Sequence, residues 1–158
     1  MSAELNAIAE FVWLEADLLD QKDYAGWLNL WDENGIYVIP IDRQGGDFKT
    51  RLNYAYDDAA MRSLRVRRLT SGESVSARAA GVTIRTVSRF RQLESSAEGT
   101  VRVRCAQHLS EFRNGRDRAY VADVTFSLRP EGESFRILEK AVLLGNSTDA
   151  LAGMTFLL

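Results

Sequence analysis

The first segment of the chain carries apolar residues at the spacing of an amphipathic helix. Between Ala3 and Asp20 they recur three or four positions apart, and a second set fills the neighbouring stripe. A helix that is apolar on so much of its circumference needs cover on several sides, so we expect a concave sheet wrapped around it. The first set is Leu5, Ile8, Ala9, Val12, Ala16 and Leu19, and the second is Phe11, Leu14 and Leu18.

Two further helices and one strand are expected in the first half of the chain. Residues 24–31 read as a short helix with Asp23 as its N-cap, and the β-rich run at 35–40 ends in proline. Residues 57–69 show a third helical pattern, and the two aspartates at its start suit the positive end of a helix dipole. Residues 74–81 have no clear period and are expected to form a loop.

The second half of the chain reads as four strands in succession. Short connections with turn residues separate them, and Asn114-Gly115 is the strongest hairpin signal in the sequence. Such connections predict an antiparallel meander, and the whole chain, 1–158, is expected to form a single α+β domain. The predicted strands span residues 82–93, 100–112, 119–128 and 135–144.

Overall charge and composition narrow the classes of partner. The 20 Lys and Arg residues nearly balance the 22 Asp and Glu residues, which leaves a formal charge of -2. This balance provides no strong field for nucleic acid or anionic lipid, so neither is expected as a partner. We also find no basic segment followed by an apolar run at the start and no stretch of about 20 apolar residues, so a cytoplasmic protein without membrane contact is expected.

A single cysteine and a single histidine limit the metal chemistry that is available. Cys105 lies in an alternating apolar run, where a buried small side chain is the expected role, and His108 follows on the same strand. A Rieske cluster needs two Cys and two His, and non-haem iron sites usually need two His and a carboxylate. We therefore expect no metal or cofactor in this chain.

Several segments in succession resemble the small (β) subunits of bacterial aromatic-ring-hydroxylating dioxygenases. Residues 15–31 are similar to the family's opening, in which an acidic helix with a Leu-Leu-Asp step leads into an aromatic-Trp-Leu helix. The strand at 35–40, the helix at 56–69 and the final strand at 135–144 also have family counterparts. In the run that enters the sheet, Arg85 alone clearly matches the family's pattern.

This resemblance implies a fold and an assembly. The fold is a cystatin/NTF2-like cone, in which a strongly curved antiparallel sheet wraps around a long N-terminal helix. The assembly is a hexamer of three large (α) and three small (β) subunits, α3β3. In such an enzyme the large subunit holds the Rieske [2Fe-2S] cluster and the mononuclear iron, and the β subunit is structural. The resemblance also implies that the chain forms a trimer by itself.

The same cone fold hosts small lyases and isomerases, so an enzymatic alternative stays open, as does a binding module. Asp20 at the end of the first helix and His108 on a central strand are the candidate acid–base pair. The three tryptophans, Trp13, Trp27 and Trp31, would line an aromatic pocket in that case, although core packing is the more typical role.

Arginines are the candidate residues for ion pairing between subunits. Arginine suits this role because its planar fork matches a carboxylate, although a solvated helix or sheet face is the simpler interpretation. Asp123, on the strand that follows the Asn114-Gly115 hairpin, is a candidate counter-ion within one subunit. The candidates are Arg62, Arg65 and Arg68 on the third helix, and Arg102 and Arg104 on a strand.

Overall fold

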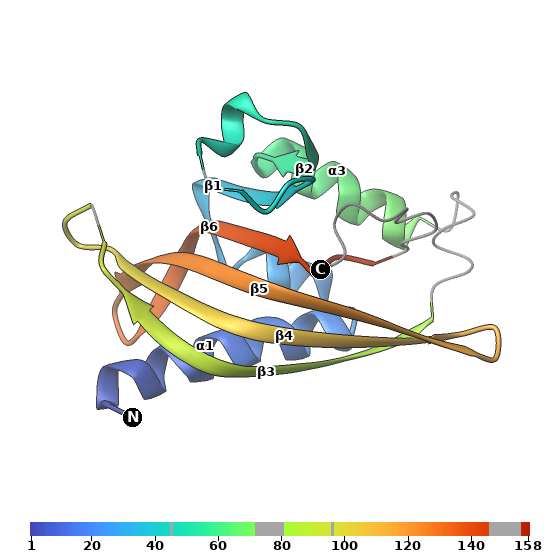
Figure 1. Ribbon diagram of the computed structural model, residues 1–158, viewed down its shortest axis with the longest axis horizontal. Helices are drawn as coiled ribbons and strands as arrows, with labels where there is room; N and C mark the ends of the chain where they lie inside the picture. The colour runs from blue at the N-terminus through green and yellow to red at the C-terminus, as the bar shows by residue number, and fades with distance from the viewer. Residues whose placement is uncertain (45, 72–80, 96, 146–155) are drawn as a thin grey trace.

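The computed structural model describes residues 1–44, 46–71, 81–95, 97–145 and 156–158, and most of the predicted loop at 74–81 lies outside them. Three α-helices and a curved sheet of six strands form the domain (Figure 1). The helices are α1 (Ala3–Asp20), α2 (Tyr24–Leu28) and α3 (Ala59–Thr70), with a short 3-10 helix η1 (Phe48–Thr50). The strands are β1 (Trp31–Pro40), β2 (Asn53–Asp57), β3 (Val82–Leu93), β4 (Val101–Arg113), β5 (Arg116–Glu131) and β6 (Ser134–Leu144).

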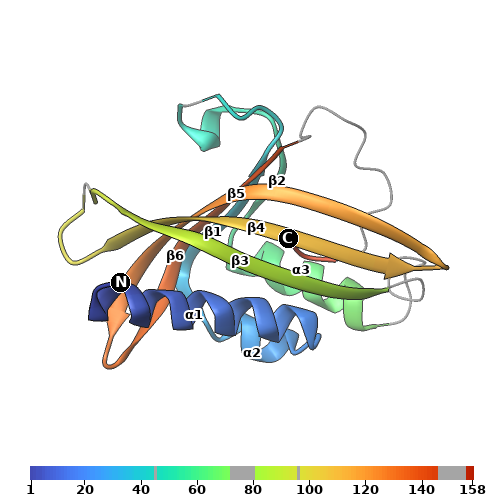
Figure 2. The same cartoon turned by 60° about the horizontal axis from the view of Figure 1, so that its bottom comes forward.

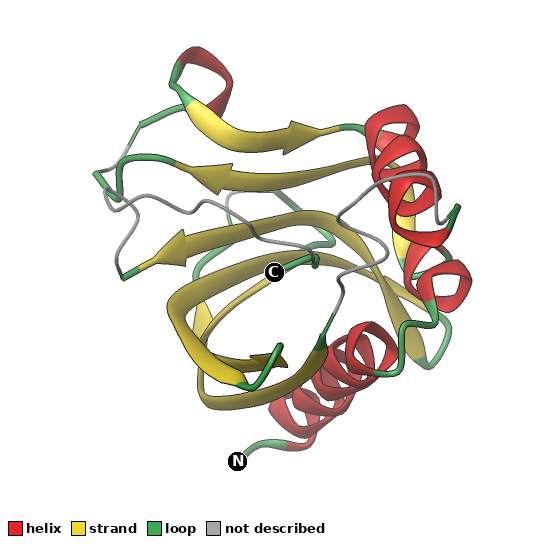
Figure 3. Cartoon of the chain, turned by 90° about the vertical axis from the view of Figure 1, so that its right-hand side faces the viewer, coloured by secondary structure: helices red, strands yellow, loops and turns green. Residues whose placement is uncertain are grey.

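The sheet has the strand order β2-β1-β6-β5-β4-β3. Strands β3 to β6 form the predicted antiparallel meander, and β1 joins it by parallel pairing with β6. The long strands curl around α1, which runs alongside β3 beneath the sheet (Figures 2 and 3). The predicted α+β cone, with a curved sheet that does not close, is confirmed.

Alternation along the strands decides which side chains enter the cone. On β4, Val103, Cys105 and Leu109 are buried, whereas Arg104 and His108 between them are exposed. A hairpin turn then reverses the chain at Asn114-Gly115, where φ is +53° and +71°. These angles match the turn type that Asn-Gly favours, and β4 and β5 therefore pair along their whole length.

The short helix after α1 ends earlier than its sequence pattern predicts. Asp23 caps α2 as expected, accepting a hydrogen bond from the Gly26 backbone at 2.9 Å. The helix then stops at Leu28, and Trp31 starts β1 opposite Ile137 of β6. Pairing with a distant strand supplies hydrogen bonds to the backbone here, so tertiary contacts override the local helical pattern.

The third helix also begins later than predicted, because β2 precedes it. Asp58 is the N-cap of α3 and accepts a hydrogen bond from the Met61 backbone at 2.9 Å. Asp57 instead ends β2 opposite Tyr37, where it is buried and receives two hydrogen bonds from Arg65, at 2.6 and 3.0 Å. The two neighbouring aspartates therefore have different roles.

The hydrophobic core lies between α1 and the concave face of the sheet. The first apolar stripe of α1 is buried except for half-buried Leu5, and Trp27 and Trp31 lie in the core as expected. Two residues of the helix depart from the prediction, since Trp13 is 42% exposed and Leu14 is 45% exposed. The Trp13 indole still donates a hydrogen bond to the Val87 carbonyl at 2.9 Å, at the edge of the core.

The different roles of the two aspartates give the first testable prediction. Replacing Asp57 with Asn removes the buried charge that holds Arg65, so urea denaturation should show a loss of about 1.5–3 kcal/mol in unfolding free energy. Asp58→Asn is the matched control, because Asn caps helices about as well as Asp, and it should stay within about 0.5 kcal/mol of wild type. Equal losses from the two variants would contradict the assignment of Asp57 to the strand.

Candidate functional site

A buried ion pair occupies the middle of the cone. Glu15 comes from α1 and Lys140 from β6, and their side chains are 1% and 0% exposed. The Lys140 ammonium donates to Glu15 Oε1 at 2.6 Å, and the Trp27 indole donates to the same oxygen at 2.7 Å. Burial lowers the pKa of Lys140, and the carboxylate beside it opposes that effect.

The rest of the cone interior is filled by the chain's own residues 156–158. Leu157 and Leu158 are only 2% and 1% exposed. Lys140 donates to the Leu158 carbonyl oxygen at 2.8 Å, and the Tyr37 hydroxyl accepts from the Leu158 backbone N–H at 2.9 Å. Arg85 of β3 donates to the Leu157 carbonyl. The polar groups that point into the cone are therefore engaged with the protein's own backbone.

Only a small cavity remains at this end of the cone. Its volume is about 10 Å³, which is roughly the space that one water molecule needs. Ligand pockets for small molecules typically measure about 300–1,000 Å³. The cavity therefore has no room for a substrate. It is lined by Leu19, Lys22, Tyr24, Gly81, Thr83, Arg85, Phe156 and Leu157.

Burial also keeps the other ionisable groups of the interior neutral. It raises the pKa of the Cys105 thiol to about 12, and it raises the pKa of the Tyr37 hydroxyl above its ordinary value. A thiol with such a pKa stays protonated at neutral pH and is a poor nucleophile. Cys105 therefore has the structural role that its place in the sequence predicts.

The structure places Asp20 and His108 on opposite faces of the sheet. Asp20 lies at the inner face, where it forms an ion pair with Arg85 and accepts a hydrogen bond from the Thr83 hydroxyl at 3.0 Å. His108 is exposed on the outer face, between the buried residues Gln107 and Leu109. The two side chains therefore do not come together as an acid–base pair.

Two of the candidate arginines on α3 form contacts within the chain. Arg62 is 2% exposed, lies over the Trp31 ring at 4.1 Å from its centroid, and donates to the Gly35 carbonyl. Its burial lowers the pKa of this guanidinium. Arg65 is held by Asp57, and that hydrogen-bonded pairing raises the pKa of Arg65. These contacts attach α3 to the sheet.

The remaining candidate arginines lie nearer the surface. Arg68 of α3 and Arg104 of β4 are exposed, and half-buried Arg102 donates to the Glu94 carbonyl at 3.4 Å. Asp123 is not their counter-ion, because it pairs instead with Arg43, at 2.9 Å, and with Arg89. The outward side of β5 near Asp123 thus meets the loop after β1 and the bend in β3, which local strand alternation does not reveal.

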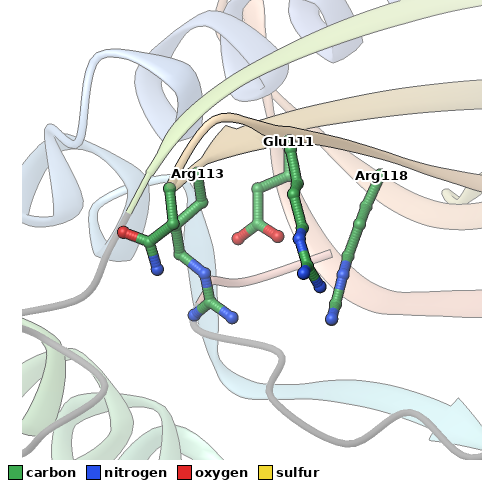
Figure 4. Close-up of a pocket in the computed structure, with 5 residues that line it drawn as sticks. Glu111, Arg113 and Arg118 are labelled. Carbon is green, nitrogen blue, oxygen red and sulfur yellow. The ribbon is translucent and has the colours of Figure 1, made fainter.

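A polar pocket of about 270 Å³ lies at the end of the β4–β5 hairpin. Figure 4 shows Glu111, Arg113 and Arg118 projecting from the two strands toward the same side. Glu111 is 1% exposed, whereas Arg116 and Arg118 are exposed. Three arginines against one glutamate give this end of the molecule a positive surface. The lining residues are Glu111, Arg113, Asn114, Arg116 and Arg118.

Comparison with known proteins identifies the family. A family model described as ring hydroxylating beta subunit matches residues 14–149. The chain belongs to this family of β subunits. It is 29% identical over 158 residues to the small subunit of anthranilate 1,2-dioxygenase from Acinetobacter baylyi, and the match covers 96% of each chain.

Solved structures have the same fold as this β subunit. The β subunit of benzoate 1,2-dioxygenase from Burkholderia mallei superposes with a TM-score of 0.77 at 20% identity, over 97% of this chain and 98% of that one. An NTF2-like protein with a cystatin-like fold from Novosphingobium aromaticivorans superposes with a TM-score of 0.63 at 15% identity, over 94% and 84% of the two chains. The predicted cystatin/NTF2-like architecture is therefore confirmed.

Two searches of the β subunit concern metals and membranes. Within the residues that the structure describes, no group of three or more His, Cys, Asp and Glu side chains is arranged to hold a metal ion. Across the same residues, no helix has the length and apolar character that crossing a membrane requires.

The interior ion pair was not identified from the sequence, although a signal for it exists. Glu15 lies four residues after Phe11 and three before Leu18, so it interrupts an apolar stripe of α1. Lys140 interrupts the apolar run at 137–144 in the same way. A charged residue within each of two buried faces suggests a buried pair, but which residues are partners depends on how the helix crosses the sheet.

The buried pair gives the second prediction. Lys140→Met should reduce the unfolding free energy by about 3–5 kcal/mol, because it leaves the Glu15 carboxylate buried without its cation. Adding Glu15→Gln removes that charge and keeps an acceptor for Trp27, so the double variant should regain at least about 1.5 kcal/mol. Urea denaturation measures both.

Lys49→Met, at an exposed lysine, is the control and should change stability by less than about 0.5 kcal/mol. If the losses of the two single variants at Glu15 and Lys140 simply add in the double variant, the two side chains are not coupled and the interpretation fails.

Proposed function

We propose that this chain is the structural, non-catalytic small subunit of a Rieske non-haem iron aromatic-ring-hydroxylating dioxygenase, and that it supports assembly of the large catalytic subunit in aromatic compound catabolism. The observation that carries the proposal is the filled cone. Leu157 and Leu158 lie where a cone-fold enzyme would need an open pocket, and the polar groups around them bind backbone atoms. Family membership supports the same role.

The chemistry then belongs to the large (α) subunit. That partner would hold the Rieske [2Fe-2S] cluster and the mononuclear iron, in a cytoplasmic α3β3 assembly. The relatives named above belong to dioxygenases for anthranilate and benzoate, which supports an aromatic substrate for the assembled enzyme. In this proposal the substrate pocket lies in the α subunit, so the β subunit contributes to activity by stabilising its partner.

Association with a large subunit is the third prediction. When the chain is co-expressed with the product of an adjacent reading frame that contains paired Cys-x-His and Cys-x-x-His motifs, the two should co-purify at a ratio of one to one. Elemental analysis should find iron in the complex and no stoichiometric metal in the β subunit purified alone, because its one His and one Cys do not meet the ligand requirement. Iron or zinc at one atom per isolated chain would contradict the non-catalytic role.

Self-association is the fourth prediction. Without its partner the chain should form a trimer, because a threefold α3β3 particle brings three β subunits together around one axis. Sedimentation equilibrium at roughly tens of micromolar measures the mass of the assembly. A particle with the mass of a single chain over that concentration range would remove the trimer from the proposal and leave association with the large subunit intact.

A further inference from the structure

Two surface features at opposite ends of the molecule have complementary chemistry. The first is the tip of the β4–β5 hairpin, residues 112–116, which we call the basic hairpin. The second is a groove between α1 and the turn that joins β5 to β6, which we call the acidic groove. The basic hairpin lies at the right-hand end in Figures 1 and 2, and the β5–β6 turn and the start of α1 lie toward the left-hand end.

The basic hairpin combines an exposed aromatic ring with positive charge. Phe112 is 57% exposed on the outer face, and Arg116 is exposed beside the turn. Arg113 and Arg116 lie directly opposite each other in the pairing of β4 with β5. Two like charges in that arrangement repel, and a carboxylate from outside the hairpin would offset the repulsion. Arg116 forms no ion pair within the part of the chain that the structure describes.

The acidic groove has the opposite charge around an apolar floor. Its volume is about 410 Å³. Phe11 and Phe135 meet edge to face in the floor, with ring centroids 5.6 Å apart, and Leu14 beside them is 45% exposed. Glu10 and Glu133 are exposed at its rim, and neither forms an ion pair with any described residue. The full lining is Ala7, Glu10, Phe11, Leu14, Glu133, Ser134 and Phe135.

We propose that the basic hairpin of one copy docks into the acidic groove of a second copy. Phe112 supplies an aromatic anchor for the apolar floor, and Arg116 supplies a planar donor for the carboxylates at the rim. The two features lie at opposite ends, so the contact is head to tail between copies and cannot form within one chain. Repeated around a closed ring it generates a cyclic assembly, which for three copies is the trimer.

This inference rests on the proposed self-association and specifies the surface that produces it. The contact should bury at least about 1,000 Å² in total, which requires the flanks of the hairpin and of α1 as well as the tip. Because opposite charges line its two sides, its affinity should fall as ionic strength rises.

Charge reversal tests the inference in solution. In sedimentation equilibrium, Arg116→Glu should weaken self-association at least about 30-fold, which corresponds to about 2 kcal/mol, because it sets like charges against each other at the contact. Glu133→Arg should do the same. Combining Arg116→Glu with Glu133→Arg in one chain restores opposite charges, so the double variant should recover self-association.

Arg104→Glu is the matched control, since Arg104 is exposed on β4 outside the basic hairpin, and it should leave self-association unchanged. Thermal denaturation of each variant confirms that it is folded. If the wild type associates and both single variants associate equally well, the assignment of this surface is overturned while the trimer stands. If Arg116→Glu affects only co-purification with the large subunit, that subunit occupies the hairpin and the inference also fails. A monomeric wild type overturns both.

Discussion

The ion pair between Glu15 and Lys140 is the interaction on which the interior of the domain depends. It joins the long helix to the middle of the sheet at a point where both side chains are inaccessible to water. A buried charge without its partner is very unfavourable, so each residue requires the other in place, and together they restrict how α1 crosses β6. Trp27 completes the arrangement by donating to the same carboxylate oxygen, which connects α2 to the pair.

The same cluster also accounts for the filled cone. Lys140 and Tyr37 bind Leu158, and Arg85 binds the carbonyl of Leu157 while it pairs with Asp20. These donors and acceptors satisfy one another inside a low-dielectric interior, where an unpaired polar group would be costly. An architecture that holds an open pocket in small-molecule enzymes here serves as a solid core, and the features available for function are displaced to the outer surface.

That outer surface is not uniform. The hairpin of β4 and β5 extends beyond the core and carries arginine and an exposed phenylalanine, whereas the far end of α1 presents glutamates around an apolar floor. An interface typically has an apolar centre and a polar rim, and both ends have this composition with opposite charge. A subunit whose interior is closed can therefore still carry specific information in the charges at its two ends.

The sequence by itself determined the elements whose signals are local. The period of α1, the Asp23 cap, the four alternating strands and the Asn114-Gly115 turn each depend on residues a few positions apart, and the counts of one His and one Cys limited metal chemistry directly. Only the tertiary structure decided what depends on distant pairing. Asp57 left the third helix for β2, and Trp31 left the second helix for β1, because strand partners far along the chain supply their hydrogen bonds. The partners of Glu15 and Asp20 lie 125 and 65 residues away, and no local pattern specifies which charged groups the folded sheet brings together.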